Sequence, residues 1–392
     1  MTAYVPFAEP SFGRAEEEAV LRVVRSGWVS TGIEARAFEE EFAGYVGTAH
    51  AVALNSCTAA LHVALRAYGI GPGDEVIVPT MTFTATAAAV VHAGATPVLA
   101  DVVPDHLTLD PDQVKSLLTT RTRAIVPVHY GGRMALLGPL REICAAHGLR
   151  LIEDAAHTLP ARDGADAAGR VGDASAFSFF ATKPITTAEG GMLCTDDPRI
   201  ADEARRWSLH GLSRGAVNRY RPGHPAAYDV DRPGFKYNMS DLAAALGRAQ
   251  LAGADRLHAR RTAIAEVYLR ELAGLERLEL PPPDTAANRS SWYLFPVRLR
   301  AAGAVRREAF RRRLHTLGVG TSVHFEPLHR FSWYRDHAVR AGQTFPVADR
   351  IADTLISLPV FPAMDEAAVA RVVAAVRRAH DEPDPSRDGT RG

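Results

Sequence analysis

The feature that most constrains the fold of this chain is an alternation of short apolar segments with helical patterns between residues 51 and 195. The apolar segments are hydrophobic along their whole length, which is typical of strands buried on both faces. This pattern predicts an α/β fold in which a largely parallel sheet is covered by helices. The expected strands are AVAL (51–54), EVIVP (75–79), TPVLADV (96–102), RAIVPVHY (123–130), LRLIEDA (149–155), ASAFSFF (174–180) and GMLCT (191–195).

The helical patterns extend beyond the sheet in both directions along the chain. Between two of them lies a segment rich in Gly, Arg, Pro and Tyr, residues 211–235. Structureless loops of this length are uncommon unless they have a function, so we expect a functional loop there. Helices are expected near residues 14–26, 35–46, 58–68, 84–92, 198–209 and 240–272.

The length of the chain predicts two domains, because 392 residues exceed the size at which one hydrophobic core stops growing. We expect a large α/β domain with an N-terminal arm over residues 1–250, and a smaller α+β domain over 251–380. The tail, 381–392, has a composition typical of disorder. The elements expected in the smaller domain are strands near 292–299 and 319–324 and helices near 305–317 and 365–379.

Composition argues against several classes of function. The 45 basic and 45 acidic residues give zero formal net charge, so no basic excess points to nucleic acid or an anionic membrane. The three cysteines, Cys57, Cys144 and Cys194, form no C-x-x-C pair. A disulfide framework or a structural zinc site is therefore not expected, and a reducing cytoplasm is favoured. We find neither a signal peptide nor a run of about 18 apolar residues that could cross a bilayer.

Glycine fingerprints for nucleotides are also missing. Neither G-x-G-x-x-G nor G-x-x-x-x-G-K-[ST] occurs, which disfavours dinucleotide and ATP chemistry. Lysine is scarce and occurs only as Lys115, Lys183 and Lys236. Arginine can replace lysine at most surface positions, but its guanidinium does not deprotonate and cannot act as a nucleophile. Biased codon usage would explain the scarcity as well, so each lysine is only a modest indicator of chemistry.

Two residues at the ends of predicted strands, Lys183 and Asp154, are candidate catalytic residues. Lys183 follows the segment 174–180, where partial burial favours the neutral amine that imine formation requires. The alternative is a lysine whose ammonium merely reaches water. Asp154 ends the segment 149–155, where open α/β sheets place their ligands. It could hold a proton on the ring nitrogen of pyridoxal phosphate (PLP), or it could cap a helix.

An anion site is expected where NSCTAAL joins a strand to a helix. The backbone N–H groups of Cys57 and Thr58, with the Thr58 hydroxyl, would suit a phosphate, although a plain helix cap gives the same pattern. Ser178 could add a second hydroxyl. Phe83 could lie flat on a cofactor ring or pack in the core. His157 could donate to the phenolic oxygen of a cofactor, or simply begin a helix.

A series of short motifs follows in order along the chain: SGWVSTG, SCTAALH, GDEVIVP, GATPV, PVHYGG, EDAAH, FSFFATK, EGG and GFKYNMSDLAAA. This ordered set resembles the sugar aminotransferase family, which comprises PLP enzymes of the aspartate-aminotransferase fold (fold type I) that act on keto nucleotide sugars. The resemblance covers roughly residues 5 to 380, and an ordered set is more specific than any single motif. FKYNMSD and HFEPLH are most similar to the members that make UDP-4-amino-4-deoxy-L-arabinose.

The resemblance implies a cofactor role for most of these residues. Lys183 matches the Schiff-base lysine, and Asp154 matches the partner of the pyridine nitrogen. His157 matches the residue that contacts the phenolic oxygen, and Phe83 the aromatic side chain on the ring. Many members have Gly at the position of Cys57, but a backbone N–H contact survives that difference. The positions that match phosphate binders are Cys57, Thr58 and Ser178.

The resemblance further implies a homodimer with shared active sites, because Asn238 matches a residue that reaches the cofactor phosphate of the neighbouring subunit. Trp28, Tyr130 and His324 fall in segments that approach the sugar. Lys236 is a candidate partner for an anionic part of the substrate, with a solvated surface lysine as the alternative.

The implied reaction is transfer of an amino group from glutamate to a keto sugar nucleotide, with a 4-keto sugar favoured. Family members that dehydrate carry His in place of the Schiff-base lysine, so Lys183 favours transamination. Two alternatives stay open. The chain could be a PLP enzyme of the same fold that acts on another ketone, such as a keto-cyclitol, or a non-catalytic PLP-fold regulator.

Overall fold

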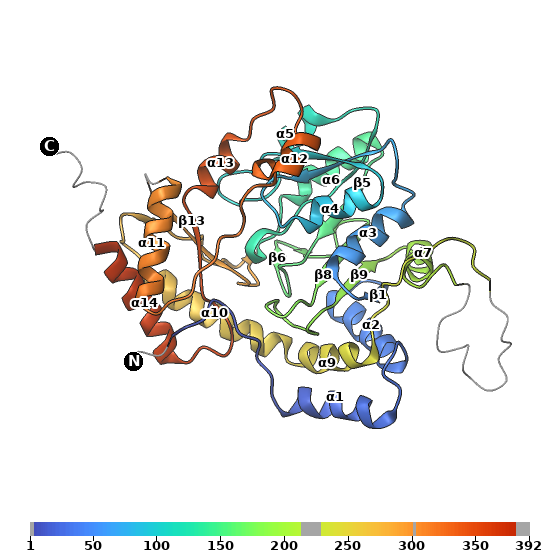
Figure 1. Ribbon diagram of the computed structural model, residues 1–392, viewed down its shortest axis with the longest axis horizontal. Helices are drawn as coiled ribbons and strands as arrows, with labels where there is room; N and C mark the ends of the chain where they lie inside the picture. Colours follow the sequence, from blue (N-terminus) through green and yellow to red (C-terminus); the bar gives the residue numbers. More distant parts are fainter. Residues whose placement is uncertain (1–3, 213–228, 301–302, 382–392) are drawn as a thin grey trace.

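The structure is a computed structural model that describes residues 4–212, 229–300 and 303–381. The predictions for most of the 211–235 loop and for the tail beyond 381 lie outside these residues. The largest sheet has 7 strands in the order β1-β9-β8-β5-β4-β2-β3 (Figure 1). These strands are β1 (His50–Leu54), β2 (Glu75–Pro79), β3 (Thr96–Ala100), β4 (Thr122–Ile125), β5 (Arg150–Asp154), β8 (Ala174–Ser178) and β9 (Gly191–Thr195).

The sheet is mostly parallel, as predicted. Strand β9 alone runs antiparallel to its two neighbours, β1 and β8, while the remaining neighbours pair in parallel. The helices of the described residues are α1 (Arg14–Ser26), α2 (Ile33–Val46), α3 (Cys57–Ala67), α4 (Ala85–His92), α5 (Pro111–Leu117), α6 (Leu137–His147), α7 (Pro198–Ser208), α9 (Asp241–Ala252), α10 (Ala254–Glu271), α11 (Ala304–Thr316), α12 (Ser332–His337), α13 (Pro346–Ala352) and α14 (Glu366–Asp381).

Both faces of the sheet are buried, which explains why its strands are hydrophobic throughout. Successive strand residues point to opposite faces. Val76 and Val78 pack in a core with residues of α3 and α4, whereas Ile77, between them, packs with residues of α5 and α6. The continuous apolar segments in the sequence therefore correspond to strands with helices on both sides.

A second, smaller core lies beside the main sheet. Its sheet has the strand order β10-β12-β13 and packs against α10, α11 and α14 (Figure 1). Val5, near the N-terminus, is buried in the same core and pairs with Val319. A third sheet joins short strands in the order β11-β6-β7. The strands outside the main sheet are β6 (Arg162–Asp163), β7 (Asp166–Ala167), β10 (Leu278–Glu279), β11 (Asn288–Arg289), β12 (Phe295–Leu299) and β13 (Leu355–Leu358).

Several predicted strands are shorter in the structure, and two depart most from the prediction. The strand predicted at 123–130 ends at Ile125, because Pro127 has no N–H for the sheet and beyond it only Val128 forms a single bridge. The strand predicted at 319–324 is absent. Val319 and Ser322 each form one isolated bridge, to Val5 and Ser357 respectively, so no common partner strand supports this segment.

The carboxyl ends of the parallel strands meet at one edge of the main sheet. The residues at or beyond those ends include Cys57, Phe83, Tyr130, Asp154 and Lys183. Open α/β sheets bind ligands at this edge. Among the described residues, no helix is long and apolar enough to cross a membrane.

Candidate active site

Lys183 lies in a turn that follows β8. Its backbone N–H donates to the carbonyl of Phe180 over 2.9 Å, and its carbonyl accepts from Arg261 Nη2 over 3.5 Å. Its ammonium affects the pKa of four other groups, those of Cys57, Asp154, His157 and His324. Four of the predicted site residues therefore lie close enough to Lys183 for its charge to shift their pKa values.

Asp154 is buried at the end of β5, with 4% of its surface exposed. One carboxylate oxygen accepts a 2.7 Å hydrogen bond from the Thr86 hydroxyl, and the other accepts from the Ala156 N–H over 3.1 Å. Burial raises the pKa of this carboxyl, while the Thr86 and Ala156 hydrogen bonds and the Lys183 ammonium oppose the rise. A buried carboxylate with these supports is suited to hold a cationic ring nitrogen.

His157 is buried in a neutral state. Burial lowers its pKa well below the ordinary value, and the Lys183 ammonium lowers it further. Its Nδ1 accepts from the Gly131 N–H over 3.2 Å. The proton of the neutral ring is therefore on Nε2, which can donate to an oxygen in the site.

The N-terminus of α3 is open towards the same edge of the sheet. The Ser56 hydroxyl caps the helix by accepting from the Ala59 N–H over 3.0 Å. Within the described part of the chain, the N–H groups of Cys57 and Thr58 donate to no acceptor. A Cβ added to Gly191 of β9 would lie under 3.0 Å from the Cys57 nitrogen, so this glycine lets the strand approach the helix terminus closely.

Aromatic rings surround the space in front of His157. Phe325 stacks on His157 with a centroid distance of 5.7 Å, and it also lies 6.0 Å from the Phe83 ring. Phe83 is 58% exposed, which excludes a place in the core and leaves its ring available. Buried Tyr130 donates its hydroxyl to the His324 carbonyl. Burial and the Lys183 ammonium lower the pKa of His324 to about 4, so this ring is neutral as well.

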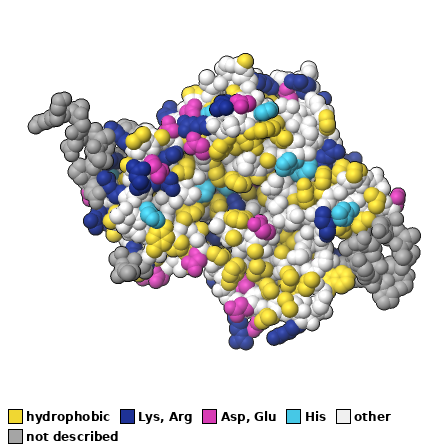
Figure 2. All heavy atoms as spheres, viewed as in Figure 1, with side chains coloured by type: hydrophobic (Ala, Val, Ile, Leu, Met, Phe, Trp, Pro, Cys, Tyr) yellow, Lys and Arg dark blue, Asp and Glu magenta, His cyan; other side chains and the backbone are white. Residues whose placement is uncertain are grey.

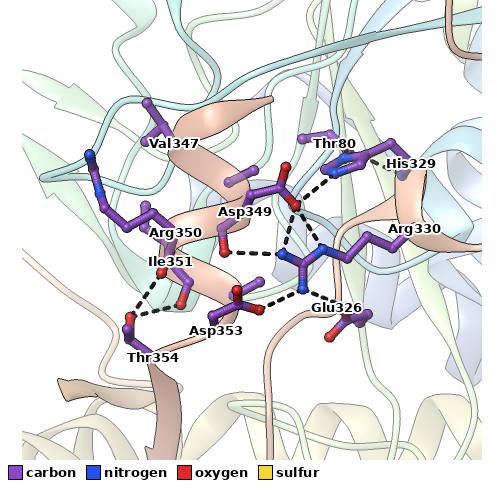
Figure 3. A network of polar contacts seen from close by, with 12 residues as sticks. Thr80, Glu326, His329, Arg330, Val347, Asp349, Arg350, Ile351, Asp353 and Thr354 are labelled. Atoms are coloured by element: carbon purple, nitrogen blue, oxygen red, sulfur yellow. Dashed lines mark hydrogen bonds and ion pairs between the residues drawn. The ribbon is translucent and has the colours of Figure 1, made fainter. Parts of the chain in front are cut away.

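The segment from Glu326 to Arg330, which directly follows His324 and Phe325, is tied to Thr80 after β2 and to α13 by a polar network (Figure 3). His329 bonds to the buried Thr80 hydroxyl over 2.7 Å and to Asp349 over 3.1 Å. The Arg330 guanidinium contacts three carboxylates, those of Glu326, Asp349 and Asp353. The network connects α13 with the β2–α4 loop, on which Phe83 lies.

Three of the predicted residues form a separate group beside the end of β1. The Asn238 amide donates to the Thr31 hydroxyl over 2.6 Å, and its oxygen accepts from the exposed Lys236 ammonium. The indole N–H of Trp28 donates to the Thr31 carbonyl over 3.2 Å. Trp28, Lys236 and Asn238 are thus gathered around Thr31 rather than around Lys183 of their own chain.

Sequence reasoning missed several residues that line this edge. Thr86, Tyr293, Phe325 and Arg261 all contact Asp154, His157 or Lys183 directly. The EDAAH and FSFFATK motifs do not indicate these partners, because the partner residues lie far from both motifs in the sequence. Only the spacing of Thr86 on the helix after Phe83 could have suggested an inward-facing hydroxyl.

These groups fit PLP. The chain provides an amine on Lys183, a buried carboxylate on Asp154 for the pyridine nitrogen, and N–H groups at the α3 N-terminus for the phosphate. The Nε2–H of His157 fits the phenolic oxygen, and the Phe83 ring is free to cover the pyridine face. The Ser178 hydroxyl, which accepts from the Phe180 N–H over 3.4 Å, lies at the end of β8 beside this edge.

Comparison with known proteins places the chain among aminotransferases. Residues 10–377 match the model of the DegT/DnrJ/EryC1/StrS aminotransferase family. The spore coat polysaccharide biosynthesis protein SpsC of Bacillus subtilis is 42% identical over 379 residues, which cover 95% of this chain and 96% of SpsC.

Solved structures agree with this result. DesV of S. venezuelae is 37% identical with a TM-score of 0.87, and the match covers 98% of this chain and 100% of DesV. The PLP form of the sugar aminotransferase Spr1654 of Streptococcus pneumoniae is 30% identical with a TM-score of 0.89. That match covers 96% of this chain and 99% of Spr1654. The predicted fold type is thereby confirmed, and so is the predicted cofactor.

Proposed function

This chain belongs to the DegT/DnrJ/EryC1/StrS aminotransferase family and is a PLP-dependent sugar aminotransferase, and from that premise we propose that it moves an amino group from glutamate to a keto sugar nucleotide. The observation that carries the proposal is the convergence of Lys183 with Asp154 and neutral His157 at one sheet edge. A 4-keto sugar is the favoured acceptor, since the FKYNMSD and HFEPLH segments resemble those of 4-aminating members.

Lys183 is proposed to bind the cofactor through Nζ and, once the donor has displaced it, to act as the base that moves a proton. Bound PLP supplies an electron sink for the negative charge left on the donor carbon. The Lys183 amine removes the proton from that carbon and returns it to the cofactor carbon on the other side of the donor nitrogen. Because the amine is held close to both carbons, one group can serve both transfers.

Asp154 and His157 prepare the site for this transfer. The Asp154 carboxylate, fixed by Thr86, would keep a proton on the ring nitrogen of bound PLP. His157 donates from Nε2 to an oxygen without bringing a second positive charge beside Lys183, because its pKa is depressed. Cys57, Thr58 and Ser178 are proposed to hold the phosphate, and Phe83 to cover the ring. Tyr130 and His324 are proposed to meet the sugar.

We also propose that the active enzyme is a homodimer with shared sites. Trp28, Lys236 and Asn238 gather around Thr31 rather than Lys183 in their own chain, which supports a role for them in the site of the neighbouring subunit. Hydrophobic side chains gather around α1 on the face seen in Figure 2. Exposed apolar patches of this kind mark interaction surfaces. The exposed large hydrophobic residues on and after α1 are Leu21, Val24, Trp28, Val29 and Ile33.

The visible spectrum of the purified protein with PLP tests the proposal. We expect a visible band that fades when glutamate is added and returns when a keto nucleotide sugar follows. Lys183→Ala should abolish turnover. Substantial amine transfer by this variant would overturn the role of Lys183, whereas a band that ignores glutamate would point to another donor.

A hybrid experiment tests the shared site. Lys183→Ala and Asn238→Ala subunits, each inactive alone, should regain activity when mixed and refolded together, because one site of the hybrid then has both residues. A protein that sediments as a monomer at the assay concentration would contradict the dimer.

A further inference from the structure

A buried tyrosine outside the motifs quoted above, Tyr293, lies against the amine of Lys183. The Lys183 Nζ lies 4.4 Å from the centroid of the Tyr293 ring, and this side chain is 9% exposed. The face of an aromatic ring attracts an ammonium through its quadrupole, and the attraction grows where water is excluded. The ring therefore offers the free lysine amine a defined position.

The Tyr293 side chain also contacts other groups of the site. Its centroid lies 4.6 Å from that of His157, with an interplanar angle of 35°. Its hydroxyl is 3.4 Å from the Thr182 hydroxyl. Burial lowers the pKa of the Arg261 guanidinium to about 10, and Tyr293 opposes this shift, so the two side chains are near each other. The phenol points to Thr182, which leaves the ring face to Lys183.

The residue before Tyr293 has a strained backbone. Trp292 has a φ of 49°, a left-handed conformation that a bulky residue seldom adopts. Such strain persists only where the surroundings fix the backbone. The indole N–H of Trp292 donates to Asp284 over 2.9 Å, and the Arg133 guanidinium covers its ring at 5.2 Å. Strain of this kind is found at functional positions.

The segment is also bonded to the turn behind His157. The N–H groups of Ser291 and Leu294 donate to the carbonyls of Gly132 and Gly131, over 3.0 and 3.1 Å. The Ser291 hydroxyl donates to the His157 carbonyl over 2.6 Å. These three hydrogen bonds fix the backbone on both sides of Tyr293 relative to the site.

From these contacts we propose that Tyr293 is a catalytic residue, whose ring face holds the Lys183 ammonium while the lysine is free of the cofactor. The inference rests on the proposed role of Lys183. It assigns the effect to the ring rather than to the hydroxyl, because the hydroxyl faces Thr182 and not the amine. The ring keeps the amine within reach of the two carbons between which it moves a proton.

Nuclear magnetic resonance tests the contact directly, since the chain has three lysines and therefore three sets of lysine side-chain signals. We would label lysine with ¹³C and record the full-length protein loaded with pyridoxamine phosphate, which leaves the amine free. Lys115→Arg and Lys236→Arg assign the signals. The ε-methylene protons of Lys183 should be shifted upfield by the ring in wild type and Tyr293→Phe, and this shift should vanish in Tyr293→Leu. An unchanged shift in Tyr293→Leu would overturn the contact.

Single-turnover kinetics with glutamate tests the consequence. Tyr293→Leu should slow the half-reaction at least tenfold and raise the isotope effect of α-deuterated glutamate, because proton transfer becomes slower relative to other steps. Tyr293→Phe and Thr182→Val should stay within threefold of wild type. Equal losses in Tyr293→Phe and Tyr293→Leu would assign the effect to the hydroxyl and overturn the proposal. Tyr293→Met replaces Tyr293→Leu if the latter does not fold.

Borohydride reduction with PLP separates this inference from the proposed function. In wild type and all variants the label should be recovered on the peptide with Lys183. If wild type is not labelled there, the role of Lys183 fails, while the resonance experiment still reports on the contact. If Lys183 is labelled but Tyr293→Leu keeps the wild-type rate and isotope effect, only the inference on Tyr293 fails.

Discussion

Single residues in this site derive their properties from partners on distant segments. The carboxylate of Asp154 is oriented by Thr86, 68 residues away in the sequence. His157 has its proton placed on Nε2 by a backbone N–H of Gly131. The type of each side chain makes its chemistry possible, whereas its protonation and direction depend on these neighbours.

A glycine gives a test at this scale. A Cβ on Gly191 would lie under 3.0 Å from both the Ser56 carbonyl carbon and the Cys57 nitrogen, a separation that real Cβ atoms do not adopt. Gly191→Ala should therefore displace the N-terminus of α3, lower the free energy of unfolding by about 1–3 kcal/mol and weaken PLP binding at least tenfold. Urea denaturation and PLP titration measure the two effects.

Gly138 in α6 is the matched control, because a Cβ there meets nothing within 4 Å. Gly138→Ala should not lower the free energy of unfolding, because alanine favours the helix more than glycine does, and it should leave PLP binding unchanged. If Gly191→Ala behaved like this control, the close approach of β9 to α3 would not matter for the phosphate site.

At the scale of elements, the site depends on where strands end. The ends of β1, β5 and β8 bring the Cys57, Asp154 and Lys183 segments to one edge, and their order in the sheet is not their order in the chain. The segment that bears His324 and Phe325 comes from the C-terminal part and is attached by the network in Figure 3. A shift of this segment would therefore move Phe325 away from the His157 and Phe83 rings.

Arg330 is the hub of that network. Arg330→Met leaves Glu326, Asp349 and Asp353 without their common cation, so the free energy of unfolding should fall by about 1–2 kcal/mol, a modest effect because the carboxylates are partly exposed. Urea denaturation measures it. The exposed Arg335 pairs with its neighbour Asp336, and Arg335→Met should not move the denaturation midpoint. Equal effects of the two variants would contradict the role of the network.

At the scale of the whole molecule, burial of neutral histidines couples stability to pH. Burial, with His92 and Arg66 nearby, lowers the pKa of His62 from 6.5 to about 4. Between these two values the unfolded chain binds a proton at this position that the folded chain does not. The free energy of unfolding is therefore fully retained above pH 6.5 and falls on acidification by up to about 1.4 kcal/mol per pH unit for each such group.

His62→Phe isolates one of these contributions, since the His62 ring packs on Phe235 and Tyr237 and has no proposed role in the reaction. The variant should keep a similar shape and remove a buried Nε2 that has no hydrogen-bond partner among the described residues. Between pH 6 and 4.5 its stability should fall less steeply than that of wild type, by up to about 1.4 kcal/mol per pH unit. Urea denaturation over this range decides; parallel curves for the two proteins would refute the burial of a neutral His62.

The sequence by itself determined the fold class, the main strands and the residue types of the cofactor site. Continuous apolar segments such as EVIVP predicted strands buried on both faces, and Lys183, Asp154 and the α3 N-terminus lie at or after the ends of strands. The local pattern did not predict residues 319–324 correctly. This segment has the sequence pattern of a strand, but its two bridges go to different partners, Val5 and Ser357. The division of the chain near residue 250 stays a prediction.

Only the tertiary structure decided which distant groups meet. Thr86, Tyr293, Phe325 and Arg261 contact the predicted residues through long-range packing, and no local periodicity encodes such contacts. The grouping of Asn238 with Thr31 likewise depends on the path of the backbone. Propensity and hydrophobic pattern act over a few residues, whereas the partners that set charge, tautomer and orientation are chosen by the packing of the whole chain.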